Sequence, residues 1–534
     1  MTQSVSASTL KNWLHDGQEI AVFDVREHGQ YGESHLFYAT PLPFSRLEVD
    51  VARLVPRKAV RVVVYDGGDE STDGVAQRAA ECLEAQGYTS VFVLEGGTAA
   101  WSKAGYVLFA GVNLPSKTFG ELVEHAYGTP RITATELAAK QASGEPLVVL
   151  DGRPVSEFFK MSIPGATCCP NGELAYRITS LVPDADTPIV INCAGRTRSI
   201  LGAQTLINLG IPNPVYALEN GTQGWYLVDL PLDHGKSQRY GDDTGSDALV
   251  SNARTLAERF DVPYVDAATV KEWEKDSSRS LFLCDVRTPE EFKAGTLPGA
   301  QLTPGGQLMQ AADQYVGVRR ARLVLFDTDG ARAGVVASWL RQMGHDASVL
   351  IGGLTSGLTL APQAALQAPA LPAVSVAELS QRLQNNEVLV VDLRGSMKYR
   401  EGHIPGALWS IRSRLAQDLE GNTLPVVLVA DEAGIAEWAA NDLGLNASVL
   451  AGGFEAWKKA GNAVEANDQV PADALCIDFL FFVHDRHDGN KEAARRYLAW
   501  ETGLVQQLDA QELAEFQLPH ASTEASDHAP ASAS

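Results

Sequence analysis

Cysteine is scarce in this chain. Its 534 residues contain 6 cysteines, and their spacing follows no regular framework. Few, irregularly spaced cysteines are typical of reduced thiols in a cytosol-like compartment rather than of a disulfide-stabilised secreted domain. The N-terminus has neither a basic flank nor an apolar core, so it lacks the pattern of a secretory signal. We therefore expect a cytoplasmic protein.

Long apolar runs and excess positive charge are also missing. The apolar stretch 477–483, which Asp478 interrupts, is far too short to span a bilayer. The net charge of −23 opposes attraction to nucleic acids and to anionic membranes. We therefore expect no membrane segment and neither a nucleic-acid nor a membrane partner. The length is too great for one ordinary core and predicts several domains.

One pattern of motifs occurs four times along the chain. Each copy has an apolar run ending in Asp-x-Arg, a second apolar run, a helical segment and a turn rich in glycine. The Asp-x-Arg motifs begin at Asp24, Asp151, Asp285 and Asp392, and related Pro-Gly-Ala elements begin at Ile163, Leu297 and Ile404. Apolar strands alternating with helices predict a small parallel α/β sheet with both faces covered. We interpret Asp-x-Arg as a fold-supporting ion pair or turn.

The repeats divide the chain into domains. We predict domains at 1–127, 128–240, 241–366 and 367–470, followed by a C-terminal helical extension and a disordered tail at 471–534. Polar or Ala/Pro-rich stretches at 237–247 and 361–372 are typical of linkers. The tail from about residue 520 is biased towards Ala, Ser and Pro.

One copy carries a cysteine where its second apolar run ends. Cys193 follows the run 188–192 and precedes a helix-like stretch at 200–207. Backbone N–H groups converge at such a strand–loop–helix junction and favour thiolate over thiol. The residues expected to bind substrate are Ala194, Gly195, Arg196, Thr197, Arg198 and Ser199. We expect Arg196 or Arg198 to contact an anionic donor by paired hydrogen bonds.

The motifs in this order resemble the rhodanese (thiosulfate sulfurtransferase) family, specifically proteins with four rhodanese domains in tandem. The resemblance covers the chain up to about residue 465. It implies a doubly wound parallel α/β fold in each domain, with helices on both faces. It also implies an active-site cysteine, here Cys193, that carries sulfane sulfur as a persulfide. The implied partners are a small-molecule sulfur donor and a thiol or cyanide acceptor, with no cofactor and no metal.

The other three copies have aspartate at the cysteine position. These residues are Asp66, Asp327 and Asp431. A carboxylate cannot accept and return a sulfur atom, so we expect these domains to be catalytically inactive. One hypothesis is that the aspartate supplies the anion that the loop N–H groups require, and the alternative is neutral decay of an unused site.

The sequence also predicts the roles of several residues outside the Cys193 loop. We interpret Cys168 and Cys169 as buried packing residues rather than resolving thiols, and Arg177 as a solvated surface side chain. The polar segment 484–488 has the residue types of a metal site but is more typical of a turn. Apolar positions at helical spacing predict a helix within 490–516 that packs on a domain or a partner chain. We assign that helix no chemistry.

Three alternative functions remain open. A phosphatase of the related dual-specificity type needs arginine six residues after the cysteine, where this chain has Ser199, with Arg198 one position earlier. Mercaptopyruvate is a rival donor, although the two loop arginines favour a doubly charged one. The third alternative is a sulfur relay or scaffold with little turnover. A homodimer is also compatible with the sequence.

Overall fold

The computed structural model describes residues 2–68, 74–241, 245–484 and 490–519. They divide into two compact units. The first unit comprises residues 1–112, 316–319 and 363–481, and the second comprises 113–315, 320–362 and 482–534. Each unit contains two five-stranded sheets. The first and fourth sequence repeats therefore form one unit, and the second and third form the other.

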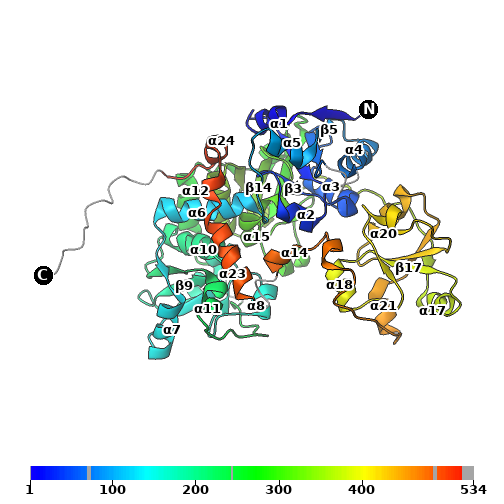
Figure 1. Cartoon of the computed structure of the whole chain (residues 1–534). Helices are drawn as coiled ribbons and strands as arrows, with labels where there is room; N and C mark the ends of the chain where they lie inside the picture. The colour runs from blue at the N-terminus through cyan, green and yellow to red at the C-terminus, as the bar shows by residue number, and fades with distance from the viewer. Residues whose placement is uncertain (1, 69–73, 242–244, 485–489, 520–534) are drawn as a thin grey trace. The chain divides into compact units, whose positions relative to one another are not determined.

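The four sheets share one strand order, and all their paired strands are parallel. Figure 1 shows the chain with its helices and strands. Across each sheet the strands are β1 (Gln3–Val5), β5 (Val91–Leu94), β4 (Arg61–Tyr65), β2 (Ile20–Asp24) and β3 (Thr40–Pro41); β6 (Arg131–Ile132), β10 (Val215–Leu218), β9 (Ile189–Asn192), β7 (Val148–Asp151) and β8 (Thr167–Cys168); β11 (Tyr264–Val265), β15 (Asp346–Leu350), β14 (Arg322–Phe326), β12 (Leu281–Asp285) and β13 (Gln301–Leu302); and β16 (Ala373–Val374), β20 (Ala447–Leu450), β19 (Val426–Val429), β17 (Leu389–Asp392) and β18 (Leu408–Trp409). The predicted fold class is confirmed.

Helices connect the strands within each repeat. The first repeat contains α1 (Ala7–Leu14), α2 (His28–Glu33), α3 (Leu47–Leu54), α4 (Val75–Ala85) and α5 (Gly97–Lys103), and α6 (Leu114–Tyr127) leads to the second. The second contains α7 (Ala134–Ser143), α8 (Val155–Lys160), α9 (Leu174–Leu181), α10 (Thr197–Asn208) and α11 (Gly221–Leu227). After α12 (Asp247–Arg259), the third contains α13 (Ala267–Lys275), α14 (Pro289–Ala294), α15 (Gly305–Gln310) and α16 (Ala331–Gln342). The fourth contains α17 (Val376–Gln384), α18 (Ser396–Glu401), α19 (Leu415–Asp418), α20 (Ile435–Asp442) and α21 (Gly453–Lys459).

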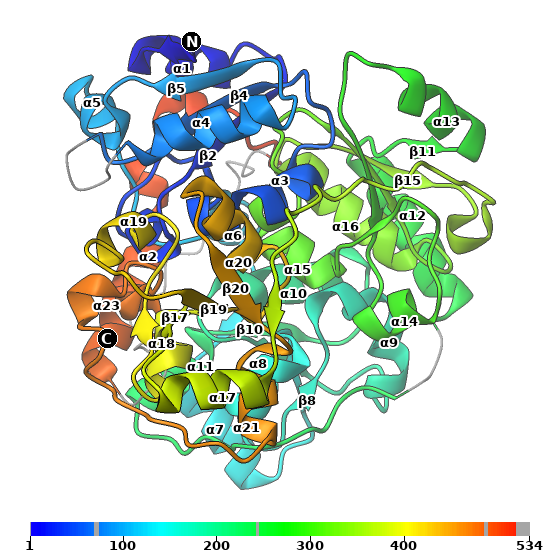
Figure 2. The ribbon, with the colours of Figure 1, turned by 90° about the vertical axis from the view of Figure 1, so that its right-hand side faces the viewer.

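These helices cover both faces of the sheets. In the fourth domain, α17, α18 and α21 are labelled in Figure 2. They contribute Leu379, Tyr399 and Trp457 to one core. The opposite face of the same sheet packs against Leu415 of α19 and Ala439 of α20. The second domain repeats this division, with α7, α8 and α11 in one core and α9 and α10 in the other. Burial on both faces explains why the strands read as continuous apolar runs.

The Asp-x-Arg motifs form the same buried ion pair in all four domains, as predicted. The arginine Nε donates to the aspartate at 2.9–3.0 Å in each. The Nη2 of each arginine also donates to the backbone carbonyl of the residue eight positions after that arginine. This hydrogen bond ties the strand end to the following turn. Each pair is thereby hydrogen-bonded at several points, which favours the burial of its charges.

Acidification is expected to destabilise the first unit because of His35. The imidazole is buried, stacks on Tyr31 with ring centroids 3.7 Å apart and shares a hydrogen bond with the Tyr31 carbonyl. Burial lowers the pKa of His35 from 6.5 to about 3, so between these values only the unfolded chain binds the proton. The contribution of His35 to the free energy of unfolding is complete above pH 6.5. It falls by at most about 1.4 kcal/mol per pH unit as the pH drops from 6.5 towards about 3. Urea unfolding at about pH 7 and about pH 5 should show a shallower pH dependence for His35→Gln than for the parent; equal slopes would refute this role.

The C-terminal segment differs from the single helix predicted within 490–516. It contains α22 (Phe481–His484), α23 (Lys491–Thr502), a 3₁₀ turn at Val505–Gln507 and α24 (Ala510–Leu513). Gly503 caps the end of α23, and the Asp509 side chain accepts two N–H groups at the start of α24. These caps end one helix and begin the next although the apolar spacing continues. The predicted tail from residue 520 lies outside the described residues.

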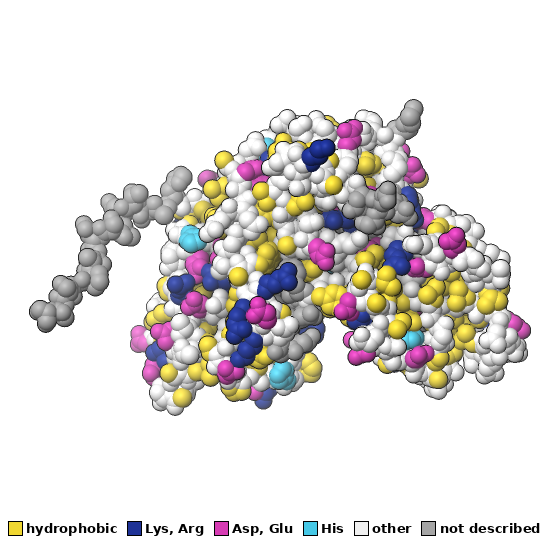
Figure 3. Space-filling model, in the orientation of Figure 1, with side chains coloured by type: hydrophobic (Ala, Val, Ile, Leu, Met, Phe, Trp, Pro, Cys, Tyr) yellow, Lys and Arg dark blue, Asp and Glu magenta, His cyan; other side chains and the backbone are white. Residues whose placement is uncertain are grey.

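The surface is mixed in charge on the face that Figure 3 draws. Acidic and basic side chains are interspersed there, although the net charge of the sequence is −23. Within the described part of the chain, every helix is too short or too polar to cross a lipid bilayer.

Candidate functional site

Cys193 lies in a loop between a buried strand and a helix. Strand β9 ends at Asn192, which pairs in register with Asp151 of β7, and α10 begins at Thr197. The Cys193 side chain is buried, with the residue only 2 % exposed. Ser199 Oγ donates a hydrogen bond to Cys193 Sγ at 3.1 Å. Together with the unpaired first-turn N–H groups of a helix, this hydroxyl can stabilise negative charge on sulfur.

The start of α11 is hydrogen-bonded to the loop that carries Cys193. The N–H groups of Thr222 and Gln223 donate to the carbonyls of Cys193 and Ala194 at 2.8 and 3.1 Å. Gly221 makes this approach possible because it has a φ of +53° and a Cβ there would lie 2.2 Å from the Cys193 carbonyl oxygen. The Gly-rich turn recognised in the sequence therefore fixes the backbone of the cysteine.

Gly221→Ala is expected to lower kcat/KM of any reaction at the Cys193 thiol roughly 10- to 100-fold, because the added methyl group must push the Cys193 backbone out of place. Gly353→Ala is the matched control. Gly353 has a φ of +46°, and its added Cβ would lie 2.3 Å from the carbonyl oxygen of Asp327, the counterpart of Cys193. Steady-state assays of both variants should show the loss only for Gly221→Ala, with similar destabilisation in urea. Equal losses of turnover would contradict this assignment.

Both loop arginines are bound to carboxylates. Arg198 makes a two-point ion pair with Glu157 of α8 at 2.8 and 2.9 Å. Arg196 pairs with Glu121 of α6 at 2.7 and 2.9 Å and also contacts Glu124. The sequence predicted that one arginine contacts the donor. That contact stays a prediction, and in this structure both charges are balanced by acidic side chains that the sequence analysis did not identify.

The C-terminal helix α23 adds a residue that the sequence analysis missed. Glu501 is 1 % exposed and accepts hydrogen bonds from Thr197 Oγ1 at 2.9 Å and Lys117 Nζ at 3.3 Å. Burial acts to raise the pKa of Glu501, but Lys117 and Thr197 outweigh it and lower that pKa below its usual value. The sequence could have indicated Glu501, because this acidic residue lies four positions after Tyr497 and so falls on the apolar face of the helix. The predicted packing on a domain is confirmed, and this helix contacts the loop that carries Cys193.

Cys168 and Cys169 are packing residues, as predicted. Both are fully buried, one in each of the two cores of the second domain. Burial raises the pKa of Cys168 to about 12 and raises that of Cys169 well above its usual value. Thiols of this kind are unreactive. Arg177, predicted as a solvated side chain, is instead buried, because it pairs with Glu173 and stacks between Tyr176 and Tyr240.

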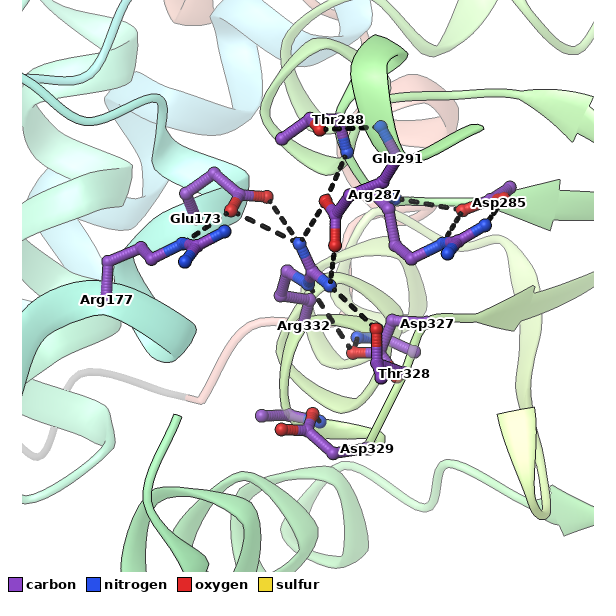
Figure 4. Close-up of polar contacts among 12 residues, drawn as sticks. Glu173, Arg177, Asp285, Arg287, Thr288, Glu291, Asp327, Thr328, Asp329 and Arg332 are labelled. Carbon is purple, nitrogen blue, oxygen red and sulfur yellow. Dashed lines mark hydrogen bonds and ion pairs between the residues drawn. The ribbon is translucent and has the colours of Figure 1, made fainter. Parts of the chain in front are cut away.

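Two of the three aspartates at the cysteine position accept hydrogen bonds from the backbone of their own loops. Asp66 accepts N–H groups from Gly68 and Ala76 at 2.9 and 3.0 Å. Asp327 accepts them from Gly330 and Ala333 at 2.5 and 3.0 Å (Figure 4). This geometry agrees with the hypothesis that the carboxylate takes the place of an anion in the loop.

In the fourth domain a lysine and an aspartate form the ion pair that a glutamate and an arginine form in the second and third domains. Glu157 and Glu291, each six residues after the Asp of Asp-x-Arg, bind the loop arginines Arg198 and Arg332. Lys398 occupies that position in the fourth domain and forms a 2.6 Å ion pair with Asp431. The loop aspartate there is held by a side chain rather than by backbone N–H groups among the described contacts.

One group of side chains has the composition of a metal site. Ligand atoms of Glu48, Cys82 and Asp442 lie within 4.8 Å of one another. Arg412 binds both carboxylates, with Nη2 at 2.9 Å from Glu48 and 2.8 Å from Asp442. Burial raises the pKa of Cys82 to about 12. The guanidinium of Arg412 therefore already balances the carboxylates of Glu48 and Asp442. The segment considered at 484–488 lies mostly outside the described residues.

Comparisons with known proteins agree with this architecture. The family model described as "Rhodanese-like domain" matches residues 6–104, 133–227, 266–358 and 375–460. The crystal structure of thiosulfate sulfurtransferase from Pseudomonas aeruginosa is 38 % identical, covers 97 % of this chain and 100 % of its own, and superposes with a TM-score of 0.89. An HTH-type transcriptional regulator from Mycobacterium tuberculosis is 34 % identical over 117 residues, which are 22 % of this chain and 50 % of that protein. The chain thus spans about half the length of that curated relative. This chain belongs to the rhodanese-like domain family.

Proposed function

We propose that the protein is a rhodanese-type sulfurtransferase that moves sulfane sulfur from thiosulfate to cyanide or a thiol through a persulfide on Cys193. The observation that carries this proposal is the position of Cys193 in a strand–loop–helix junction with Ser199 bonded to its sulfur. The likeness to the Pseudomonas thiosulfate sulfurtransferase over nearly the whole chain supports the choice of reaction and donor.

The reaction consists of two displacements at sulfur. The Cys193 thiolate attacks the outer sulfur of thiosulfate, forming a Sγ–S bond while the S–S bond of thiosulfate breaks and sulfite leaves with the electron pair. The acceptor then attacks the outer sulfur of the persulfide, and Cys193 leaves as thiolate. Both states of the enzyme are anionic, so Ser199 and the loop N–H groups can stabilise each of them without rearrangement.

The loop arginines serve this chemistry as oriented charges. Arg198 is fixed by two hydrogen bonds to Glu157, and Arg196 is fixed by Glu121. Such pairing orders the backbone between Cys193 and α10 and leaves the donor to be recognised chiefly by N–H groups.

The test is direct detection of the persulfide. The full-length protein is incubated with thiosulfate, digested without reductant and examined by mass spectrometry; the peptide carrying Cys193 should gain roughly 32 Da, and cyanide should remove this mass as thiocyanate. Mercaptopyruvate and an aryl phosphate are run in parallel. If mercaptopyruvate but not thiosulfate adds this mass to Cys193, mercaptopyruvate replaces thiosulfate as the donor. Phosphate release without a mass gain would overturn the proposal.

A further inference from the structure

The Cys193 loop, residues 193–199, is held in place without the use of its own backbone donors. Among the hydrogen bonds of the described residues, none is donated by a backbone N–H group of 194–199. The two ends of the loop are fixed through carbonyl groups instead. The start of α11 donates to the carbonyls of Cys193 and Ala194, and at the other end Asn171 Nδ2 donates to the carbonyl of Arg198 at 2.8 Å. The loop N–H groups therefore stay available for an anionic sulfur.

The middle of the Cys193 loop is held by two helices from outside the second repeat, α6 before it and α23 near the end of the chain. Arg196 pairs with Glu121 of α6, and Thr197 Oγ1 donates to Glu501 Oε1 of α23 at 2.9 Å. Thr197 lies directly against α6 as well, because a Cβ on Gly120 would lie 2.7 Å from Thr197 Cγ2. The shape of the loop at 195–197 thus depends on helices added to the domain.

The Glu501 carboxylate is held in a fixed position. Lys117 of α6 donates to the Oε1 atom of Glu501 at 3.3 Å. The same ammonium lies over the rings of Tyr497 and Trp500, 5.0 and 5.5 Å from their centroids. Helix α23 packs against both α6 and α11 (Figure 1). A buried acceptor that is ordered before the loop binds it gives a strong, well-defined hydrogen bond.

The second carboxylate oxygen of Glu501 lies against the backbone of the loop. A Cβ on Gly195 would lie 2.9 Å from Glu501 Oε2 and 3.4 Å from Gln223 Nε2. Within the described part of the chain, Glu501 Oε2 and both polar atoms of the Gln223 side chain have no hydrogen-bond partner. Burying a polar group without a partner costs about 1–3 kcal/mol. Support of the fold alone does not explain a carboxylate at this place.

We infer that Glu501 is a positioning residue for sulfur transfer, because its hydrogen bond to Thr197 holds residues 195–197 in the shape in which their N–H groups bind the anionic sulfur. The inference rests on the proposed reaction at Cys193. Glu501 acts through Thr197, so it changes the rate without taking part in any bond that forms or breaks. The C-terminal segment, to which the sequence analysis assigned no chemistry, then belongs to the active site.

The first experiment measures kcat per folded molecule of the full-length protein with thiosulfate and cyanide. Glu501→Ala should lower kcat roughly tenfold, the loss that corresponds to about 1.4 kcal/mol of transition-state stabilisation. Glu501→Gln keeps an oxygen atom that can accept from Thr197 and should recover most of the parent kcat. Glu492→Ala is the matched control, because Glu492 lies on the same helix and is 86 % exposed. Its kcat should equal that of the parent.

A double-mutant cycle separates positioning from support of the fold. Thr197→Val removes the hydroxyl group at nearly constant volume and should lower kcat as much as Glu501→Ala does. The two changes together should lower kcat no further than either alone, because both remove the same hydrogen bond. Urea unfolding of every variant measures stability, which a merely structural contact would change while kcat per folded molecule stayed constant.

The outcomes distinguish this inference from the proposed function. An unchanged kcat in folded Glu501→Ala, equal losses in Glu501→Ala and Glu501→Gln, or additive losses in the cycle would each refute the positioning role and leave the sulfur transfer standing. If Glu501→Ala does not fold, the test is decided by Thr197→Val, which must lose activity, and Glu501→Gln, which must keep it. Absence of a persulfide on Cys193 of the parent protein after incubation with thiosulfate would overturn the sulfur transfer itself.

Discussion

Cys193→Ser is expected to abolish thiocyanate formation from thiosulfate and cyanide, lowering kcat by on the order of 10³-fold or more. The serine hydroxyl is a far weaker nucleophile at neutral pH than a thiolate, and an oxygen atom cannot form the persulfide. The replacement is nearly isosteric within the buried loop, so the fold should persist. Stopped-time thiocyanate assays on the purified variant measure the effect.

Two controls make this result interpretable. Cys168→Ser and Cys284→Ser remove buried thiols outside the loop, and burial raises the pKa of both to about 12. These variants should lose stability and retain kcat per folded molecule. Turnover that survives in Cys193→Ser, or that disappears equally in the two controls, would show that another group carries the sulfur.

Arg332→Met is expected to reduce the free energy of unfolding of the second unit by about 3–5 kcal/mol. Arg332 is fully buried and donates to Glu173 of the second domain at 3.0 and 3.2 Å and to Glu291 of the third at 2.8 and 2.9 Å (Figure 4). Its charge also lies 4.0 Å from Asp327. Methionine fills much of the volume but removes the cation that Glu291 shares with the buried Glu173 and Asp327, and of these Glu173 retains its ion pair with Arg177. Urea unfolding followed by circular dichroism measures the loss.

A second substitution tests the cause of that loss. Burial acts to raise the pKa of Glu291, but the Arg332 guanidinium outweighs it and lowers that pKa to about 2. Arg332→Met combined with Glu291→Gln should therefore cost less than the sum of the single changes, because the second removes a carboxylate that the first has left unpaired. Arg254→Met, at a 62 % exposed position, should change stability by no more than about 0.5 kcal/mol. A loss below about 1 kcal/mol for Arg332→Met would contradict the role of this cation.

Much of the fold could be predicted because its signals are local. Apolar runs such as 188–192 and the Asp-x-Arg spacing act within one strand and one turn, and the four sheets and four buried ion pairs follow from them. The strand–loop–helix setting of Cys193 was predictable for the same reason. Parallel register then brings the ends of β7 and β9 to one edge of the sheet.

The partners of the loop could not be predicted, because they come from distant parts of the chain. Glu121 and Glu124 lie on the connecting helix α6, and Glu501 lies on α23. Helical periodicity identifies the buried face of such a helix but not the surface that it covers. The burial of Arg177 was missed for a related reason, because it depends on Tyr240 from the stretch after the last strand of the domain.

The contact between Thr197 and Glu501 joins residues 304 positions apart. A ribosome making this chain therefore completes the sheet around Cys193 long before it synthesises the helix that touches the same loop. At the usual elongation rate of about 5–20 residues per second, the delay lasts some tens of seconds. During that interval the loop lacks its contact with Glu501, so this contact forms late in biosynthesis, after translation of the fourth domain.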